Sequence, residues 1–415
     1  MFRRVASLMV VVLVLPGVWG VGRSAAQDVG VGAAGFQTII VDPYSQALGG
    51  ATVALRGYPG AASINPAAIG RPQTIQLGSN WNTSEGGFFQ TPWLPDAFTD
   101  TWLTSPSIDV RLRRWAFAYQ FKQFTWGDIA FRDAQNNLLD RADLKDRSHK
   151  VVVAYDLRPN LTMGLGVNLI LSDLSGMVVG AEQDLGGETT VSFDLGLVYD
   201  LEFDVPFGRL KPSLGWSLTD FGRPIRYAGD SRAVAPRESP LTMVMRGGLS
   251  LQAELDEQWL RRPVVTLGLH GGLSKYLVGV DDDFESYGPF EALVKTWKPI
   301  EVRTNALNAE PAEFKKVGVL DQLITHAGLE ASLLRIVFLR WGDFDEPGYV
   351  GGRQYATFGF GIDLYYVALD YSKAGSSDSR SPFDGMTFWR LTARIPLASS
   401  PDNFWPGLFR ELRRF

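Results

Sequence analysis

The sequence predicts an all-β protein: a 14-stranded antiparallel transmembrane β-barrel with an N-terminal hatch inside or below its lumen. Three observations lead to this prediction. Apolar and polar residues alternate with a period of two, several alternating segments run for ten residues or more, and the links between them are short and long in turn. A tilted strand needs about 9–11 residues to cross a bilayer, whereas strands of soluble proteins commonly have about 5–6.

The first element along the chain is a predicted export signal over residues 1–26. Two arginines precede the apolar run VASLMVVVLVLPGVWGV, which ends in the small residues of GRSAAQ. This order predicts a signal peptide that is cleaved between Ala26 and Gln27. A membrane anchor is disfavoured because the run is short and contains proline and glycine. No later segment has about 18 continuous apolar residues, so we expect no helical span in the mature chain.

Residues 27–72 form the second element, a predicted hatch or plug. The segment is rich in glycine and alanine and has helix-start signals at Ser45 and at Asn65, where Pro66 follows in the first helical position. Polar backbone cannot face lipid unpaired, so this segment must lie in the lumen or outside the membrane. Its apolar content favours a packed plug over the alternative, a flexible periplasmic linker.

The alternating strands occupy the third element, the predicted barrel of residues 73–397. In residues 161–172 the apolar side chains from Leu161 to Leu171 share one face, while threonine, glycine, asparagine and serine share the other, with Ile170 as the exception. A soluble β-sandwich alternates as well. The strand lengths and the aromatic residues at the ends of the apolar faces favour an outer-membrane barrel.

The strands and links follow in a regular order. The predicted strands lie near 73–82, 115–124, 127–133, 149–157, 161–172, 189–201, 211–219, 241–253, 263–275, 323–333, 335–342, 355–364, 366–372 and 386–397. The short links are Thr125-Trp126, 158–160, 202–210, 254–262, Leu334 and Tyr365, and the long ones are 83–114, 134–148, 173–188, 220–240, 276–322, 343–354 and 373–385. Short turns are typical of the periplasmic side, which would place both termini there.

The last element is the tail, residues 398–415. Its aromatic and leucine residues together with its arginines fit an interfacial amphipathic helix in the periplasm, and a frayed tail is the equal alternative.

Few residues indicate chemistry. The chain has no cysteine and three histidines, and the formal net charge of -5 gives no basic surface for nucleic acid. The GxGxxG at 30–35 has no strand before it, and DDDFES at 281–286 is typical of a solvated acidic loop. We expect no catalytic residue, metal site or cofactor. Five residues are predicted to line the lumen: Arg246, His270, His326, Arg390 and Arg394.

The front segment ALGGATVALRGYPGAASINPAAIG resembles the N-terminal signature of FadL-like outer-membrane proteins. Gly49, Gly50 and Ala51 match its small-residue stretch, and Asn65, Pro66 and Ala67 match its Asn-Pro-Ala turn. The resemblance implies a 14-stranded barrel with an N-terminal hatch.

Within this superfamily the chain is most similar to the PorV/PorQ group of type IX secretion proteins. The segments that carry the likeness are FKQFTWGDIAFRDAQNN, GWSLTDFGRPIRYAGDSRAVAPRESPLTMVMRGGLSL and the run from HAGLEASL to VALDYS, within residues 40–397. An acidic residue that this group carries before the Asn-Pro is absent here, where Arg56 stands.

The resemblance implies a non-enzymatic outer-membrane scaffold. Its partners would be membrane lipid, a large translocon barrel and secreted cargo with C-terminal signal domains, and loops 220–240 and 276–322 are the expected docking surface. The alternatives are a FadL-like transporter of hydrophobic small molecules and a purely structural barrel. The lumen arginines Arg246, Arg390 and Arg394 favour the scaffold over a lipid carrier.

Overall fold

The computed structural model describes residues 33–82, 101–132, 138–172, 188–227, 237–255, 258–259, 262–279, 286–303, 314–376 and 384–397. The predicted signal peptide with its Ala26–Gln27 cleavage site, the tail 398–415 and nearly all of the acidic run 281–286 lie outside the described residues.

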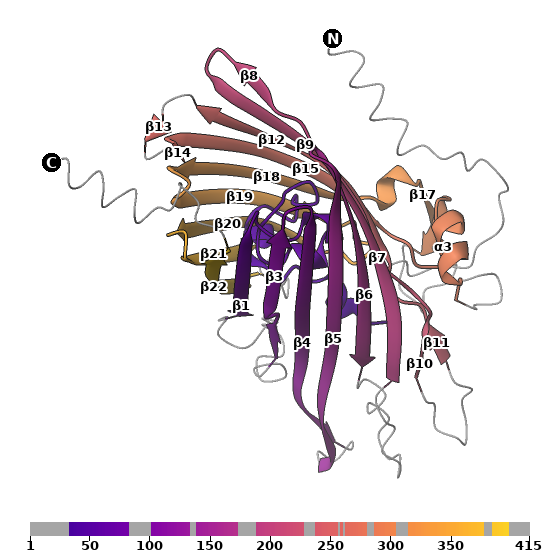
Figure 1. The fold of residues 1–415 in the computed structure, drawn as a ribbon. Coiled ribbons are helices and arrows are strands. Elements are labelled where there is room, and N and C mark those ends of the chain that lie inside the picture. The colour runs from indigo at the N-terminus through magenta and orange to yellow at the C-terminus, as the bar shows by residue number, and fades with distance from the viewer. Residues whose placement is uncertain are drawn as a thin grey trace.

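One antiparallel sheet closes on itself into a barrel (Figure 1). Its wall strands are β1 (Thr74–Asn82), β2 (Trp102–Thr104) with β3 (Ser107–Leu112), β4 (Trp115–Arg132), β5 (Leu138–Arg158), β6 (Leu161–Ser172), β7 (Glu188–Asp200), β9 (Gly208–Gly222), β12 (Val244–Leu255), β15 (Val265–Tyr276), β18 (Ile324–Leu333), β19 (Val337–Asp345), β20 (Gln354–Asp363), β21 (Val367–Gly375) and β22 (Thr387–Pro396). Strands β2 and β3 share one position between β1 and β4, and β8 (Phe203–Val205) only extends the turn before β9, so the wall has fourteen positions. The first and last strands close the barrel, with Thr74 opposite Pro396 and Asn82 opposite Phe388.

The predicted count of fourteen is confirmed, although two errors in the predicted strands cancel. Residues 115–124 and 127–133 are one strand, β4, and the predicted link Thr125-Trp126 is an irregularity in its pairing with β5. The predicted loop 83–114 contains the missing position, β2 and β3, whose alternation is broken at Pro106. The predicted loop 134–148 is also wrong because β5 begins at Leu138. Its early part is rich in charged residues and carries no apolar alternation.

The wall has an apolar outside and a mostly polar inside, as the alternation predicts. On β6 the outward Leu165 is 52% exposed and the inward Asn168 is 0% exposed. Large hydrophobic side chains are exposed on strand after strand around the wall, including Phe117, Val151, Phe193, Leu269, Leu329 and Leu391. Burying this belt in lipid removes apolar surface from water, which is the main favourable term available to it. Among the described residues, no helix has the length and apolar character to cross a membrane.

The described part of the hatch segment, residues 33–72, lies inside the barrel (Figure 1). It contains η1 (Gly35–Thr38), α2 (Pro43–Ala47), η2 (Ala61–Ser63) and η3 (Pro66–Ala68). The helix expected near Ser45 begins two residues earlier, because Asp42 is its N-cap and accepts from the Ser45 amide at 3.0 Å. The second helix signal is confirmed, with Asn65 as N-cap and Pro66 at the first position.

The two ends of the barrel differ. At one, the short-turn end, neighbouring strands are joined by residues 113–114, 159–160, 334–336 and 364–366. At the other, the long-connection end, β9 is joined to β12 through β10 (Ile225–Tyr227) and β11 (Arg237–Ser239), and β15 to β18 through residues 277–323. A further small pair at the short-turn end is β13 (Gln258–Trp259) with β14 (Arg262–Pro263).

The connection between β15 and β18 has a fold of its own, which we call the appendage (residues 286–303 and 314–322). It comprises α3 (Pro289–Lys295), the β16 (Ile300–Arg303) and β17 (Phe314–Val317) hairpin, and η5 (Leu320–Gln322). Ala292 and Tyr287 of the appendage pack with Leu218 of β9. Leu218 is buried there, whereas Leu214, four residues earlier on the same outer face of β9, is exposed. The appendage therefore covers the outside of the barrel wall near β9 (Figure 1).

Candidate functional site

The Asn-Pro-Ala turn fastens the hatch to the wall. Asn65 Oδ1 accepts from the Ala67 amide at 3.0 Å, while Asn65 Nδ2 donates to the Val53 carbonyl at 2.7 Å and to the Leu197 carbonyl of β7 at 3.1 Å. One fully buried side chain thus caps η3, ties two parts of the hatch together and reaches the barrel.

Glycines in the wall make this approach possible. Gly164 of β6 and Gly196 of β7 are direct cross-strand partners, and both lie under the Asn65–Ala67 turn. A Cβ at Gly196 would come within 2.8 Å of Pro66 Cδ, and one at Gly164 would meet the Pro66 backbone. The hatch backbone can therefore touch the strands only because these positions have no side chain.

The Gly49-Gly50-Ala51 stretch is the second point of attachment. Gly49 and Gly50 end α2 with positive φ values of 60° and 81°, which glycine adopts without strain. Their contacts are with β18 and β19: the Gly49 carbonyl accepts from His326 Nδ1 at 2.8 Å, and a Cβ on Gly49 would meet the Asp343 backbone. Ala51 is buried beside them.

A buried ion pair fixes α2. Arg390 Nη1 lies 3.0 Å from Asp42 Oδ1, and Arg390 Nη2 donates to Ser107 Oγ at 2.6 Å. Burial raises the pKa of Asp42 to about 6, against the attraction of Arg390, which lowers it. Removing one partner of such a pair leaves the other charge uncompensated in a dry site.

An apolar cluster, which we call the seal, closes the long-connection end of the lumen. Phe36, Ile40 and Val41 of the hatch pack there against inward side chains near the strand ends. These are Leu103, Phe124, Ile170, Val244, Tyr276, Ile324, Phe344, Tyr355, Ala374 and Phe388. Lys122 Nζ adds polar contacts to the carbonyls of Gln37 and Ile39, at 3.2 and 3.0 Å.

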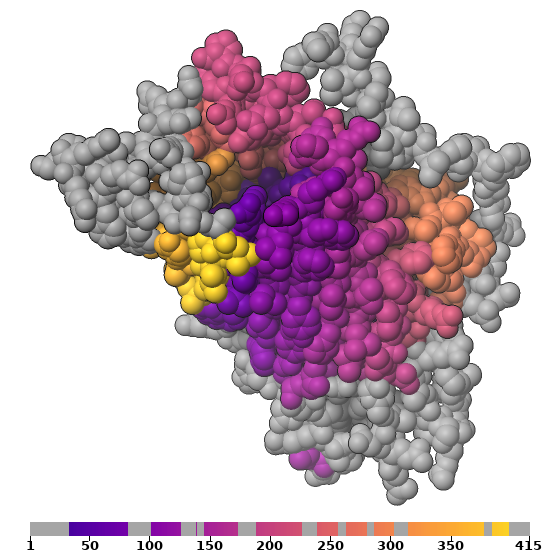
Figure 2. All heavy atoms as spheres, in the orientation of Figure 1, coloured from indigo at the N-terminus to yellow at the C-terminus, as the bar shows by residue number. Residues whose placement is uncertain are grey.

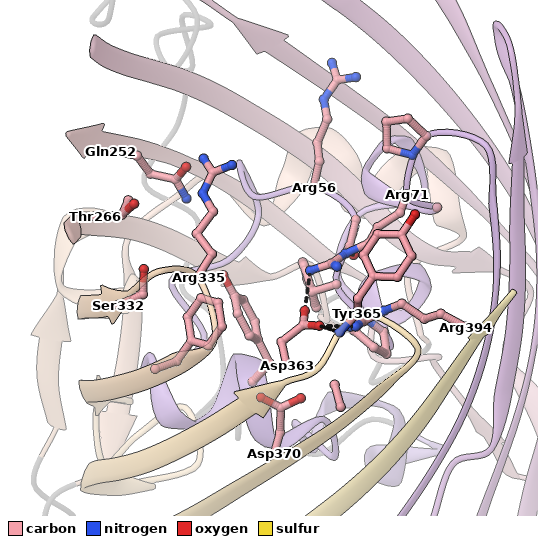
Figure 3. A pocket seen from close by; sticks show the side chains of 18 of the residues that line it. Arg56, Arg71, Gln252, Thr266, Ser332, Arg335, Asp363, Tyr365, Asp370 and Arg394 are labelled. Carbon is pink, nitrogen blue, oxygen red and sulfur yellow. Dashed lines mark hydrogen bonds and ion pairs between the residues drawn. The ribbon is translucent and has the colours of Figure 1, made fainter. Parts of the chain in front are cut away.

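At the short-turn end the lumen contains a cavity of about 690 Å³ (Figure 3). Its lining comes from the hatch, from strands β3, β5, β12, β15 and β18 to β22, and from the short turns, and it is strongly charged. The space-filling view is correspondingly hollowed beside the turn around β8 (Figure 2). Of the five residues predicted to line the lumen, Arg394 is the one that lines this cavity, where it contacts Asp363 at 2.7 Å.

Sequence reasoning missed the central charged group of this cavity. Arg340 is almost fully buried, lies 2.8 Å from both Glu330 and Asp370, and stacks over the Tyr44 ring at 4.3 Å from the ring centroid. Its place on the polar face of VFLRWGDFD is a signal that was available, because it alternates with Leu339 and Trp341. Its carboxylate partners depend on strand register, which no motif reveals.

The other predicted lumen residues point inward but are covered by the hatch or by neighbouring side chains. Arg390 and His326 contact the hatch as described, and Arg246 donates to Thr219 Oγ1 at 2.8 Å. His270 lies 2.9 Å from Ser250 Oγ through Nδ1, and His326 lies 2.7 Å from Ser274 Oγ through Nε2.

The Ser250–His270 contact lacks two features of a nucleophile–base pair. Both residues are almost fully buried and neither lines the cavity, and within the described part of the chain His270 Nε2 has no hydrogen-bond partner. A nucleophile–base pair needs an orienting third group and an approach for substrate. Among the described residues, no group of three or more metal-ligating side chains is gathered in one place.

No family model matches the chain, and no curated protein matches it. Solved structures with a similar fold include the toluene transporter TbuX of Ralstonia pickettii, at 15% identity and a TM-score of 0.42, with 85% of this chain and 96% of that chain covered. The toluene transporter TodX of Pseudomonas putida is similar at 13% identity and a TM-score of 0.40, covering 84% and 95%. A FadL homologue of Pseudomonas aeruginosa is similar at 11% identity and a TM-score of 0.40, with 86% of this chain and 98% of that chain covered. These scores are low, so the barrel architecture rests on the strand pairing described above.

Proposed function

We propose that this chain is an outer-membrane docking scaffold, a PorV-like component of type IX protein secretion. An antiparallel barrel with an apolar outside and a filled, polar inside is the form in which strands cross a bacterial outer membrane. We place the short-turn end and both termini in the periplasm, following the usual asymmetry of turns and loops.

The observation that carries the proposal is that α3 exposes apolar side chains outside the barrel. The lumen of the same barrel is closed by the hatch at the long-connection end. Phe290 and Val294 are 76% and 75% exposed and lie one helical turn apart on an appendage that packs on the barrel wall through other residues such as Ala292. Phe290 is held in place by an edge-on contact with Phe221 of β9, with ring centroids 5.0 Å apart. Exposed apolar groups on a fixed helix are typical of a protein-binding surface.

The test replaces these side chains and asks whether protein partners are lost. The full-length double variant Phe290→Glu with Val294→Glu is purified in mild detergent from its own cells after crosslinking, and its partners are identified by mass spectrometry. We expect the large translocon barrel and signal-bearing cargo with the native protein, and at least about a tenfold loss with the variant. Phe207→Glu is the matched control, because Phe207 is also exposed but lies in the turn before β9, at the other end of the barrel. Equal recovery from all three proteins, or no translocon with any of them, would contradict the proposal.

A FadL-like transporter of hydrophobic small molecules is the second candidate. It is favoured by an irregularity in the wall, where the pairing of β7 with β9 shifts between Phe193 and Leu195. TbuX and TodX, which have a similar fold, are toluene transporters. Mass spectrometry of the same preparation separates the candidates, since a hydrophobic compound retained without a protein partner supports transport.

A further inference from the structure

We propose that the cavity at the short-turn end binds a small polyhydroxylated organic anion, such as a sugar acid or a sugar phosphate. This site is distinct from the appendage, and it does not depend on the proposed docking function. The cavity volume of about 690 Å³ falls within the range of small-molecule sites, roughly 300–1,000 Å³.

Positive charge is in excess among the residues that line the cavity. Seven arginines and four carboxylates line the cavity. The carboxylates are satisfied by three of these arginines: Asp156 lies 2.8 Å from Arg111, Asp363 lies 2.7 Å from Arg394, and Glu330 and Asp370 share Arg340. Four arginines remain, namely Arg56, Arg71, Arg113 and Arg335.

The partners of the remaining arginines do not cancel the excess. The Arg56 guanidinium contacts Asp200 at 2.7 Å and also donates to Thr162 Oγ1 and to the Val198 carbonyl, so it is engaged by the wall. Arg71 shares Asp363 with Arg394. Arg335 shares Glu254 with Lys211, and Arg113 has no ion-pair partner within the described part of the chain. Among the described residues, the lining together with the ion-pair partners Asp200, Glu254 and Lys211 contains eight cationic and six carboxylate side chains. Guanidinium groups in this situation bind carboxylates and phosphates.

Two of the lining arginines are accessible to solvent, and therefore to an anion. The Arg335 and Arg71 side chains are 42% and 39% exposed, although both belong to the lining. Figure 3 shows Arg335 and Arg71 on either side of Asp363, with the Arg56 guanidinium pointing away from that carboxylate. An anion in the cavity would therefore meet the exposed guanidinium groups of Arg335 and Arg71.

Two buried hydroxyl groups also line the cavity and point to a ligand independently of the charges. Thr266 of β15 and Ser332 of β18 are direct cross-strand partners, both line the cavity, and both are more than nine-tenths buried. Within the described part of the chain, neither hydroxyl oxygen has a hydrogen-bond partner. Buried polar groups in native proteins nearly always have a partner, so an unpartnered pair in the lining of a cavity indicates a polar ligand. Gln252 of β12 continues the same row (Figure 3).

The charged groups and the hydroxyls together define which ligand the cavity would bind. The guanidinium groups call for an anionic group, and the row of hydroxyl and amide groups calls for several hydroxyls on the same molecule. A purely hydrophobic ligand would leave both sets of polar groups desolvated and unpaired, at a cost in free energy.

Calorimetry on the full-length, detergent-purified protein tests the inference. The probes are glucuronate and glucose 6-phosphate, with glucose supplying hydroxyls without charge and propionate supplying charge without hydroxyls. We expect at least one of the two anionic sugars to bind with a Kd of about 1 mM or tighter, and both partial probes to bind at least about tenfold more weakly.

Two variants separate ligand binding from folding. The double variant Thr266→Val with Ser332→Ala removes hydroxyls that have no partner, so its melting temperature should match that of the native protein while sugar binding weakens at least about tenfold. Arg335→Gln should weaken binding by a similar factor. Arg209→Gln is the matched control, because Arg209 lies at the same end on β9 and is not part of the cavity lining.

Three results would overturn the inference: neither anionic sugar binds at about 10 mM, the partial probes bind as tightly as the sugars, or the hydroxyl variant binds as tightly as the native protein.

Discussion

The two ends of the lumen are built from the same alternating strands but from opposite chemistry. At the long-connection end the inward side chains are apolar, such as Ile324 and Phe344, and they pack around Phe36 of the hatch. At the short-turn end the inward side chains of the same strands are Glu330 on β18 and Arg340 on β19, and a cavity is left between them and the hatch. One end is therefore closed by close packing, and the other is charged and hollow.

The difference between the two ends shows how one segment can plug a wide barrel. The hatch fills the seal with bulky side chains and meets the wall in the middle through glycines and small residues. Beneath it, ion pairs hold the arginine and carboxylate groups in place without filling the space. A continuous water path through the barrel would have to pass the seal, and the cavity alone does not provide one.

Truncating the central side chain of the seal tests most directly whether close packing closes this end of the lumen. Phe36→Ala should destabilise the packing of residues 33–41 by about 3–5 kcal/mol, because the side chain is almost fully buried in the cluster. We expect ion conductance across planar bilayers to appear or to rise, and amides of residues 33–41 to exchange faster with deuterium. Phe207→Ala, at an exposed position, is the control and should change neither. Unchanged conductance and exchange in Phe36→Ala would show that the seal does not close the lumen.

Asp42 allows the attachment of the hatch to be tested by pH. Its pKa is about 6 when buried and 3.8 when free, so the docked hatch binds the proton more tightly than the released hatch. The free energy of docking should therefore be greatest below about pH 4, fall by roughly 3 kcal/mol as the pH rises to about 6, and stay level above that. Hydrogen exchange of residues 42–50 between pH 4 and pH 7.5, corrected for the intrinsic rate, measures this change.

The control for the pH experiment is Asp42→Asn, which keeps a capping side chain but cannot ionise. The native-minus-variant difference isolates Asp42 from other titrating groups, such as Asp109, which also lies near Arg390. A difference that is constant with pH would contradict a raised pKa at Asp42.

Most of the wall could be predicted from the sequence because alternation reports directly which side chains face lipid. Prediction from alternation failed in the first part of β5, where the sequence does not alternate between apolar and polar residues. It also failed where Pro106 interrupts the strand position shared by β2 and β3. Ile170, the exception to alternation in β6, has a physical explanation, since it is an inward residue of the seal.

The site was harder to predict than the wall. The sequence indicated Asn65 and Pro66 through helix-start chemistry and the Gly49-Gly50 pair through the resemblance to FadL-like proteins, and it placed Arg394 on an inward face. It offered no way to connect Arg340 with Glu330 and Asp370, or Thr266 with Ser332, because these partners lie on different strands and meet only through register.

The smallest expected effect concerns the contact between hatch and wall that lies between the two ends. Gly196→Ala would place a methyl group within 2.8 Å of Pro66 Cδ and against Asn65 Oδ1, so the turn must move away at a cost of about 1–3 kcal/mol. We expect faster hydrogen exchange at residues 65–68, with the exchange of the strand amides unchanged. Gly247→Ala is the matched control, because a Cβ there meets nothing within 4 Å and alanine is the better strand residue. If both variants protect the turn equally, the glycines of the wall do not decide how closely the hatch docks, and the two ends of the lumen are held apart by the seal and the ion pairs alone.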